Sequence, residues 1–180
     1  MKSLKHTIQE SLNKIGIYES LRIGINDKPR EYYPTTFKEL RQIIEQRYEE
    51  EGPGTKDNPI NFNDIDVSEI TSFCDDDKEI LFLGIFQHTE FEYIDVSEWN
   101  VSNVENMQDM FYNCQLLKEI DLSNWDVSNV TNMSTMFVDC RNLKSVGDLS
   151  NWDVSNVEYM NHMFDDCKEE IIPNWYKKMI

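Results

Sequence analysis

The sequence contains no long hydrophobic run and little glycine or proline. Its longest apolar stretch, Ile80 to Phe86, is interrupted by Gly84, whereas a bilayer span needs about 20 apolar residues. Six glycines and five prolines in 180 residues exclude collagen-like and low-complexity sequences. The first residues lack the apolar core and cleavage site of a secretory signal. We therefore expect a cytoplasmic protein that does not bind membranes.

Basic residues are scarce in the C-terminal two thirds of the chain. Residues 1–58 carry ten Lys or Arg and ten Asp or Glu, so the whole net charge of −17 lies in residues 59–180. An acidic surface repels phosphates, so direct binding of DNA or RNA is not expected, whereas a protein partner with a basic surface is favoured. A surface that only keeps the protein soluble would explain the same imbalance.

A repeat with a period of 26 residues occupies the C-terminal half. The segment IDVSEWNVSNVENMQDMFYNC, which starts at Ile94, returns as IDLSNWDVSNVTNMSTMFVDC from Ile120. It returns again as DLSNWDVSNVEYMNHMFDDC from Asp148, one residue late because Gly147 is inserted. Self-similarity of this kind is typical of repeat architectures. Tryptophan, methionine and cysteine recur in register: Trp99, Trp125 and Trp152; Met110, Met136 and Met163; Cys114, Cys140 and Cys167.

Each repeat predicts a short strand followed by a helix. Ile120 and Leu122 alternate with polar residues, which is typical of a strand with one buried face. A Ser-x-x-Glu capping box predicts a helix start at Ser102 and at Ser155. Apolar residues after the strand recur at helical spacing and define one stripe: Val130, Met133, Met136, Phe137 and Cys140.

A strand and a helix of this size can bury their apolar faces only by stacking on neighbouring units. We therefore predict an α/β fold, a short right-handed solenoid with one short parallel strand and one helix per repeat. Residues 94–170 are assigned to three repeats and residues 59–93 to a degenerate capping repeat, with its strand signature at Phe62 to Ile70. Residues 171–180 are assigned to a C-terminal cap.

Residues 1–58 are predicted to be an N-terminal helical segment. Two helices are expected in this segment. The later one begins at Thr36, where a Thr-x-x-Glu capping box precedes an apolar face. We expect this helix to pack on the open end of the solenoid. A first helix is predicted from apolar residues at helical spacing, namely Leu4, Ile8, Leu12 and Ile15.

The repeat unit DLSNWDVSNVTNMSTMFVDC resembles the BspA-type repeats, leucine-rich-repeat-like units of bacterial surface proteins that are similar to repeats in phages of gut bacteria. The resemblance covers about residues 59–170. It implies a leucine-rich-repeat-like solenoid that serves as a binding scaffold, without catalytic residues. The N-terminal sequences KSLKHTIQESL and YYPTTFKELRQIIEQRYEEEG are similar to the leader of phage-encoded members. A phage-encoded protein would act in the host cell cytoplasm.

The cysteines and histidines are interpreted as structural. Cys114, Cys140 and Cys167 share the buried stripe at a helix spacing of about 8 to 10 Å, which exceeds disulfide reach. They are expected to be buried free thiols, whereas Cys74 is expected to be exposed in a loop. Three histidines in unrelated contexts, without a nucleophile motif or zinc-ligand spacing, predict no catalytic residue, no metal site and no cofactor.

The methionines and tryptophans of the repeats are also assigned to packing. Methionine at helical spacing beside valine and phenylalanine is typical of a core. The tryptophans are expected to pack under the turns that follow each strand. The alternative for the tryptophans is an exposed aromatic column that would bind carbohydrate or peptide.

The function favoured by these patterns is a non-enzymatic protein–protein interaction module. One alternative is a phage anti-defence protein, anti-CRISPR-like, whose acidic columns imitate phosphates toward a nucleic-acid-handling immune protein. Arg141 and Lys144 interrupt any continuous acidic stripe and weaken that alternative. Another alternative is a virion-associated structural protein. The candidate partner-binding residues are the aligned carboxylates Asp95, Asp121 and Asp148, together with Glu98, Asp126 and Asp153.

Overall fold

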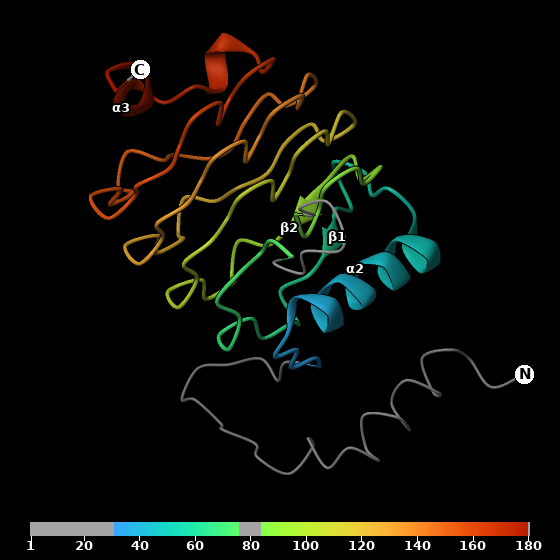
Figure 1. Ribbon diagram of the computed structural model, residues 1–180. Helices are drawn as coiled ribbons and strands as arrows, with labels where there is room; N and C mark the ends of the chain where they lie inside the picture. Colours follow the sequence, from blue (N-terminus) through green and yellow to red (C-terminus); the bar gives the residue numbers. More distant parts are fainter. Residues whose placement is uncertain (1–30, 76–83, 180) are drawn as a thin grey trace, which may run out of the picture.

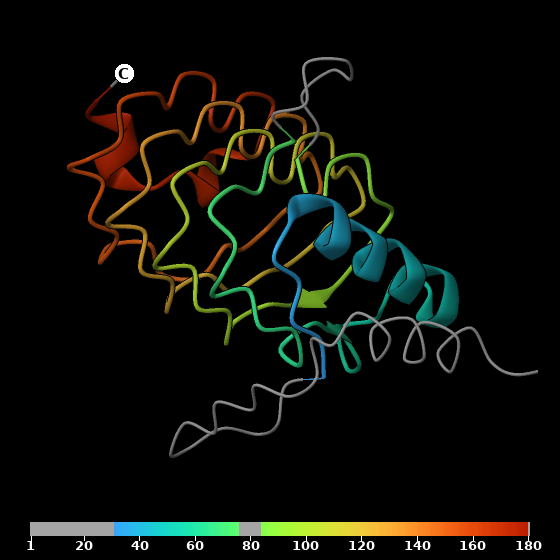
Figure 2. The same cartoon turned by 60° about the horizontal axis from the view of Figure 1, so that its bottom comes forward.

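The computed structural model describes residues 31–75 and 84–179, and in this part of the chain successive turns stack side by side (Figures 1 and 2). Apart from one helix of 15 residues, its regular elements are short, and most of the described residues lie outside helices and strands. The predicted first helix, from Leu4 to Ile15, lies outside the described residues. The elements are α2 (Phe37–Glu51), β1 (Ile60–Asn61), β2 (Ile94–Asp95), the 3-10 helix η2 (Glu169–Ile171) and α3 (Asn174–Lys177).

Two lines of parallel pairing join the stacked turns. The first line starts where β1 pairs with β2 and continues as single bridges from Tyr93 to Glu119 and from Glu119 to Ser145. Because both lines advance by one repeat at a time, equivalent residues of successive repeats lie next to each other. The second line consists of single bridges that join Ser72, Asn106, Asn132 and Tyr159 in turn.

Equivalent aromatic side chains form columns inside the stack. The rings of Trp99 and Trp125 are stacked with centroids 6.2 Å apart. The indole N–H of Trp125 donates to the Val96 carbonyl of the preceding turn over 3.0 Å, and Trp99 and Trp152 make the equivalent bond. All three tryptophans are at most 6% exposed, so their predicted burial is confirmed and the exposed aromatic column is wrong. The second column consists of Phe86, Phe111, Phe137 and Phe164, with centroids 5.3, 5.3 and 5.2 Å apart.

The helix predicted in each repeat is wrong, although its buried stripe is confirmed. Residues 133–139 form consecutive turns, as do the equivalent residues of the neighbouring repeats. Thr135 and Asp139 have φ angles of 57° and 61°, in the left-handed region that a right-handed α-helix excludes. Side-chain burial is nevertheless complete along the predicted stripe of Val130, Met133, Met136, Phe137 and Cys140.

Hydrogen bonds between turns replace the bonds of the predicted helix. The N–H groups of Met133 and Phe137 donate to the carbonyls of Tyr159 and Met163 in the next repeat, over 2.7 and 2.9 Å. Donors used in this way cannot form the i to i−4 bonds of an α-helix. The predicted capping boxes do not form either, since the N–H of Ser102 donates to the Asn100 side chain.

The predicted register of the capping repeat is also wrong. The strand is Ile60–Asn61, which precedes the signature proposed at Phe62 to Ile70. Ser72 bridges to Asn106, and the Asn103 side chain donates to the Ser68 carbonyl over 2.8 Å. The IDVSEI segment therefore lies beside the WNVSNV segment of the next repeat, because the two sequences share the same turn chemistry.

Helix α2 covers the end of the stack nearest β1, as Figure 2 shows. It begins after Thr36, whose hydroxyl accepts from the Glu39 N–H over 3.2 Å, so the predicted helix start is confirmed. Leu40 and Ile44 are fully buried in the core. The guanidinium of Arg47 forms two bonds with the Asp64 carboxylate, of 2.6 and 2.8 Å. Apolar burial and this ion pair together fix α2 on the first turn.

The last turn is covered by η2 and α3. Ile171 and Tyr176 are buried at 5% and 4% exposure. The Tyr176 ring packs edge-on against Phe164 at 5.2 Å, and its hydroxyl accepts from the Met163 N–H over 3.2 Å. Tyr176 thus extends the phenylalanine column and satisfies one backbone donor of the last repeat.

Candidate functional site

The predicted carboxylates Asp95, Asp121 and Asp148 occupy the same place on successive turns. Asp95 ends β2, and the bridges from Tyr93 to Glu119 and on to Ser145 bring the following turns into register. The N–H of Asp148 donates to the Ser123 hydroxyl over 2.7 Å, which joins the second turn to the third. Adjacent paired strands lie about 4.8 Å apart. We call these three residues the acidic column.

Each carboxylate of the acidic column also caps a turn of its own repeat. The side-chain oxygen of Asp95 accepts from the N–H of Ser97, and Asp121 and Asp148 accept from the serine two positions on, each over 3.0 Å. Such Asx turns fix the backbone locally. The recurrence of aspartate at this position therefore has a structural cause, and the charge that it places on the surface is a second property of the same residue.

Asp126 and Asp153 lie in a second column that begins with Asn100. Asn100, Asp126 and Asp153 accept from the backbone N–H of the serine two residues on, over 3.2, 3.1 and 3.0 Å. The two aspartates are exposed. Because the first repeat uses a neutral amide for the same turn, a negative charge is not required for the turn to form.

Hydrogen bonds keep these carboxylates ionised. A bond from the Ser128 hydroxyl, together with the Ser128 N–H, lowers the pKa of Asp126, while the nearby charge of Asp153 opposes this shift. Bonds from Ser155 lower the pKa of Asp153 in the same way. The Ser150 N–H lowers the pKa of Asp148. At neutral pH all three side chains carry a negative charge.

Glu98 and Asp95 belong to a cleft between α2 and the first turns. This N-terminal cleft has a volume of about 500 Å³. The charged residues of its lining are acidic apart from Arg47, which is paired with Asp64. The backbone N–H of the exposed Glu98 donates to the Asn63 side chain over 2.9 Å. The remaining lining residues are Glu31, Tyr32, Glu50, Glu51, Asn61 and Asn63.

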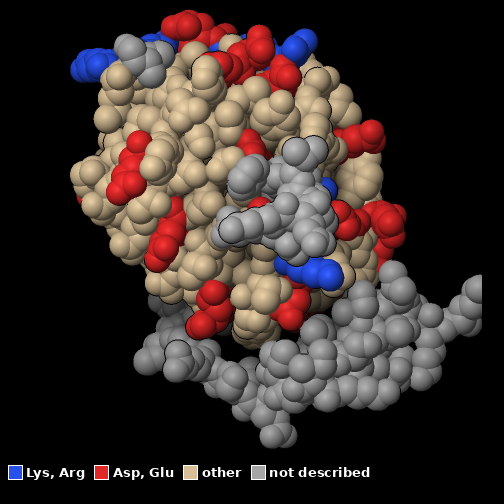
Figure 3. Space-filling model, viewed as in Figure 1, with Lys and Arg blue, Asp and Glu red and all other residues tan. Residues whose placement is uncertain are grey.

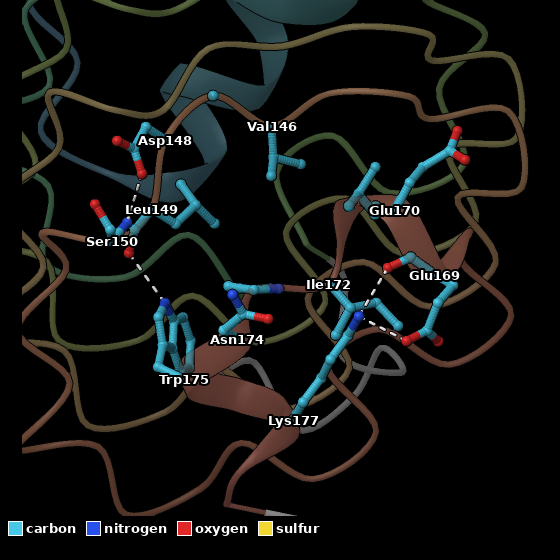
Figure 4. A pocket seen from close by; sticks show the side chains of 13 residues that line it. Val146, Asp148, Leu149, Ser150, Glu169, Glu170, Ile172, Asn174, Trp175 and Lys177 are labelled. Carbon is cyan, nitrogen blue, oxygen red and sulfur yellow. Dashed lines mark hydrogen bonds and ion pairs between the residues drawn. The ribbon is translucent and has the colours of Figure 1, made fainter.

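A larger cleft of about 770 Å³ lies at the other end of the stack, and the third carboxylate of the acidic column lines it (Figure 4). One wall is the last turn, residues 146–150, and the other is formed by residues 169–177 of η2 and α3. Lys177 reaches across its own wall to Glu169, with 2.6 Å between Nζ and Oε1. We call this larger cleft the C-terminal cleft.

Acidic and basic side chains are unevenly distributed on the surface. On the face in Figure 3, red acidic side chains form separate patches, and blue basic side chains are fewer. Lys118 pairs with Glu92, and Arg141 with Asp139 at 2.6 Å, so these cations are engaged by local carboxylates. The acidic character therefore comes in patches along the stack.

No group of three or more His, Cys, Asp or Glu side chains in residues 31–75 and 84–179 could hold a metal ion. His162 is exposed, and its Nδ1 lies 2.6 Å from an oxygen of Asp165. None of the helices in these ranges is both long and apolar enough to cross a bilayer.

No disulfide joins the four cysteines, and one of them differs from its predicted environment. Cys114 and Cys140 are buried as expected, and burial raises the pKa of Cys114 to about 12. Each donates its S–H to a carbonyl of the preceding turn, over 3.0 and 3.1 Å. Cys167 is half-buried. The prediction that Cys74 is exposed is wrong, since it is 1% exposed and bridges to Gly84.

Two features of these sites escaped sequence reasoning. The clefts depend on how α2 and the C-terminal residues dock, which no local pattern reveals. The second feature is a ladder of asparagine side chains that join successive turns. The sequence could have indicated it, because Asn103, Asn129 and Asn156 recur in register in the repeat. Each donates from Nδ2 to a serine carbonyl of the preceding turn, over 2.8, 2.7 and 2.6 Å.

The fold and these ladders define a protein of stacked repeats in which most recurring side chains join one turn to the next. A family model described as "Mycoplasma protein of unknown function, DUF285" matches residues 81–176, slightly more than half of the chain. The chain belongs to this family. Comparisons with curated proteins and with solved structures gave no match.

Proposed function

We propose that this chain is a non-enzymatic protein–protein interaction module that binds a partner with a basic surface through its acidic column. The stacked turns would form a right-handed leucine-rich-repeat-like solenoid, as in the BspA-type repeats that the sequence resembles. A phage-encoded protein of this kind would act in the host cell cytoplasm. We propose no cofactor and no direct contact with nucleic acid.

The observation that carries this proposal is the alignment of the carboxylates of Asp95, Asp121 and Asp148 on three successive turns. Hydrogen bonds from the turns fix each carboxylate, so little side-chain entropy is lost when a cation approaches. Aligned charges of one sign also raise the local potential and speed the encounter with a basic partner. The buried tryptophans and phenylalanines serve the stack and offer no surface to a ligand.

The test neutralises the column without disturbing the turns. Asparagine at position 100 already caps an equivalent turn, with 3.2 Å between the Ser102 nitrogen and its Oδ1. The triple variant Asp95→Asn, Asp121→Asn, Asp148→Asn should therefore keep the fold and lose three charges. Lysine substitutions would remove the caps and are less suitable.

The matched control removes the same charge elsewhere, with Asp57→Asn, Glu69→Gln and Glu158→Gln, which are all exposed. Immobilised wild-type and variant proteins are used for capture from a cell lysate, with quantitative mass spectrometry. We expect at least one basic protein to be retained by the wild type and the control but lost by the column variant. Retention by all three, or loss from both variants, would show that the column is not the recognition surface.

A further inference from the structure

The strand edge of the last repeat has an unused backbone donor. In the preceding turn, the N–H groups of Ile120 and Leu122 donate to the carbonyls of Ser145 and Val146, over 3.0 and 3.1 Å. Leu149 is the residue that corresponds to Leu122 in the last repeat. Its N–H has no hydrogen-bond partner among the described residues, although Leu149 is only 3% exposed. A nearly buried donor without a partner is unfavourable and rare.

The C-terminal cap covers this edge incompletely. The indole Nε1–H of Trp175 donates to the Leu149 carbonyl over 3.0 Å. Trp175 provides no acceptor for the Leu149 N–H. Between the edge and the cap lies the C-terminal cleft of about 770 Å³, with Val146 and Leu149 on one wall and Ile172 on the other. Figure 4 shows Asn174 between the two walls. The cleft is thus bordered by an open strand edge and by apolar side chains.

The charges around the cleft select for a basic occupant. Asp148 lies on the strand edge, and Glu169 and Glu170 lie on the opposite wall. Lys177, the basic residue of the lining, is paired with Glu169. An excess of carboxylates remains after this pairing, and it would attract a Lys or Arg side chain placed beside Asp148.

We propose that the C-terminal cleft binds an extended, basic segment of a partner protein as one further parallel strand. The segment accepts a hydrogen bond from the Leu149 N–H, as the Asp95 carbonyl does for Phe62 and the Val146 carbonyl for Leu122. Its inward side chains are apolar and contact Val146 and Leu149, and its outward side chain beside Asp148 is Lys or Arg, because side chains alternate along a strand. This site shares Asp148 with the acidic column but includes neither Asp95 nor Asp121.

The chain's own repeat supplies the probe. A labelled peptide with the sequence of residues 117–124, LKEIDLSN, has the strand pattern that pairs with the last repeat, and a second peptide replaces its aspartate by lysine. The peptides are titrated into the full chain and followed by fluorescence anisotropy. We expect saturable binding of the lysine peptide and binding weaker by about tenfold or more for the aspartate peptide, whose carboxylate would face Asp148.

Two variants locate the binding. Asn174→Trp fills the cleft, whereas Lys178→Trp places the same side chain on an exposed position outside the lining. We expect the first to weaken peptide binding by about tenfold or more and the second to leave it unchanged. Asp95→Asn with Asp121→Asn should also leave it unchanged, so a failure of the acidic column is distinguishable from a failure of the cleft.

Hydrogen exchange tests the backbone bond directly. In the free protein the amide of Leu149 should exchange faster than that of Leu122, and saturation with the lysine peptide should slow it. No saturable binding, equal binding by Asn174→Trp, or unchanged exchange at Leu149 would overturn the proposal. Equal affinity for the aspartate peptide would instead assign the cleft to a second copy of this chain.

Discussion

The indole nitrogen of Trp175 donates to the carbonyl of Leu149 over 3.0 Å, and this bond repeats the one from Trp152 to Leu122 in the turn before. Trp175 comes from α3, where Asn174 and Trp175 repeat the Asn-Trp pair found at Asn151 and Trp152. The ring of Trp152 lies 6.5 Å from that of Trp175. A side chain that follows the three repeats therefore terminates the tryptophan column.

Trp175→Phe should lower the free energy of unfolding by about 1 kcal/mol, because it removes the hydrogen bond and keeps most of the ring. Trp152→Phe removes the same bond one turn earlier and should have a similar effect. Urea denaturation followed by circular dichroism measures both. If Trp175→Phe has no effect while Trp152→Phe destabilises, the cap does not hold the last turn.

Trp125→Ala should be far more damaging, since Trp125 is 4% exposed and its indole bonds to Val96. Deleting a packed ring costs about 3 to 5 kcal/mol, a large share of the about 5 to 15 kcal/mol that stabilises a typical domain. Much of the protein should be unfolded at 37 °C. Tyr159→Ala is the control, because Tyr159 is 57% exposed and its loss should cost less than about 0.5 kcal/mol. A wild-type denaturation midpoint for Trp125→Ala would contradict the core assignment.

The thiols should react in the order of their exposure. Cys167 is the half-buried cysteine, whereas Cys74, Cys114 and Cys140 are at most 1% exposed. The pKa of Cys114, raised to about 12 by burial, keeps its reactive thiolate scarce at neutral pH.

With a small alkylating reagent and mass spectrometry, native Cys167 should be modified about tenfold faster than the other three, or more. In denaturant all four should react at similar rates, which serves as the control. Faster native labelling of Cys74 than of Cys167 would show that the bridge between Cys74 and Gly84 does not persist in solution.

Burial could be predicted from the sequence because it depends mainly on which residues are apolar. Met136 and Phe137 recur in register and are fully buried. The backbone conformation of the same segment could not be predicted from the spacing of its apolar residues. Consecutive turns, each with one residue at positive φ, bury the same stripe of side chains as a helix would. A signal existed at Asn113, Asp139 and Asp166, since Asn and Asp tolerate positive φ better than most residues. Thr135 carries no such signal.

Asp95, Asp121 and Asp148 lie on successive turns, and each side chain caps a turn of its own repeat. The Asp-x-Ser spacing at Asp121 and Asp126 is the signal, because an Asx turn needs a short acceptor two residues before the N–H. Cys74 could not be placed from its acidic neighbours, because its burial depends on Gly84 across an intervening segment. Contacts between segments distant in sequence decided the features that were mispredicted.

The remaining prediction concerns acid stability. Hydrogen bonds from Ser128 and Ser155 lower the pKa values of Asp126 and Asp153 below their ordinary value of 3.8. The folded state therefore binds fewer protons than the unfolded state in this range. The stabilisation is complete above the unfolded pKa and is lost as the pH falls from about 4 through the folded pKa.

The variant Asp126→Asn, Asp153→Asn tests this, because Asn100 forms the equivalent turn with 3.2 Å between the Ser102 nitrogen and its Oδ1. At neutral pH its melting temperature should stay within about 2 to 4 °C of the wild type. Between about pH 5 and about pH 3 the wild type should lose more of its melting temperature than the variant, since only the wild type must protonate these two carboxylates. Thermal melts by circular dichroism at several pH values give both curves. Parallel curves across this range would mean that the two carboxylates have the same pKa in the folded and unfolded states, and that their serine bonds add nothing to stability.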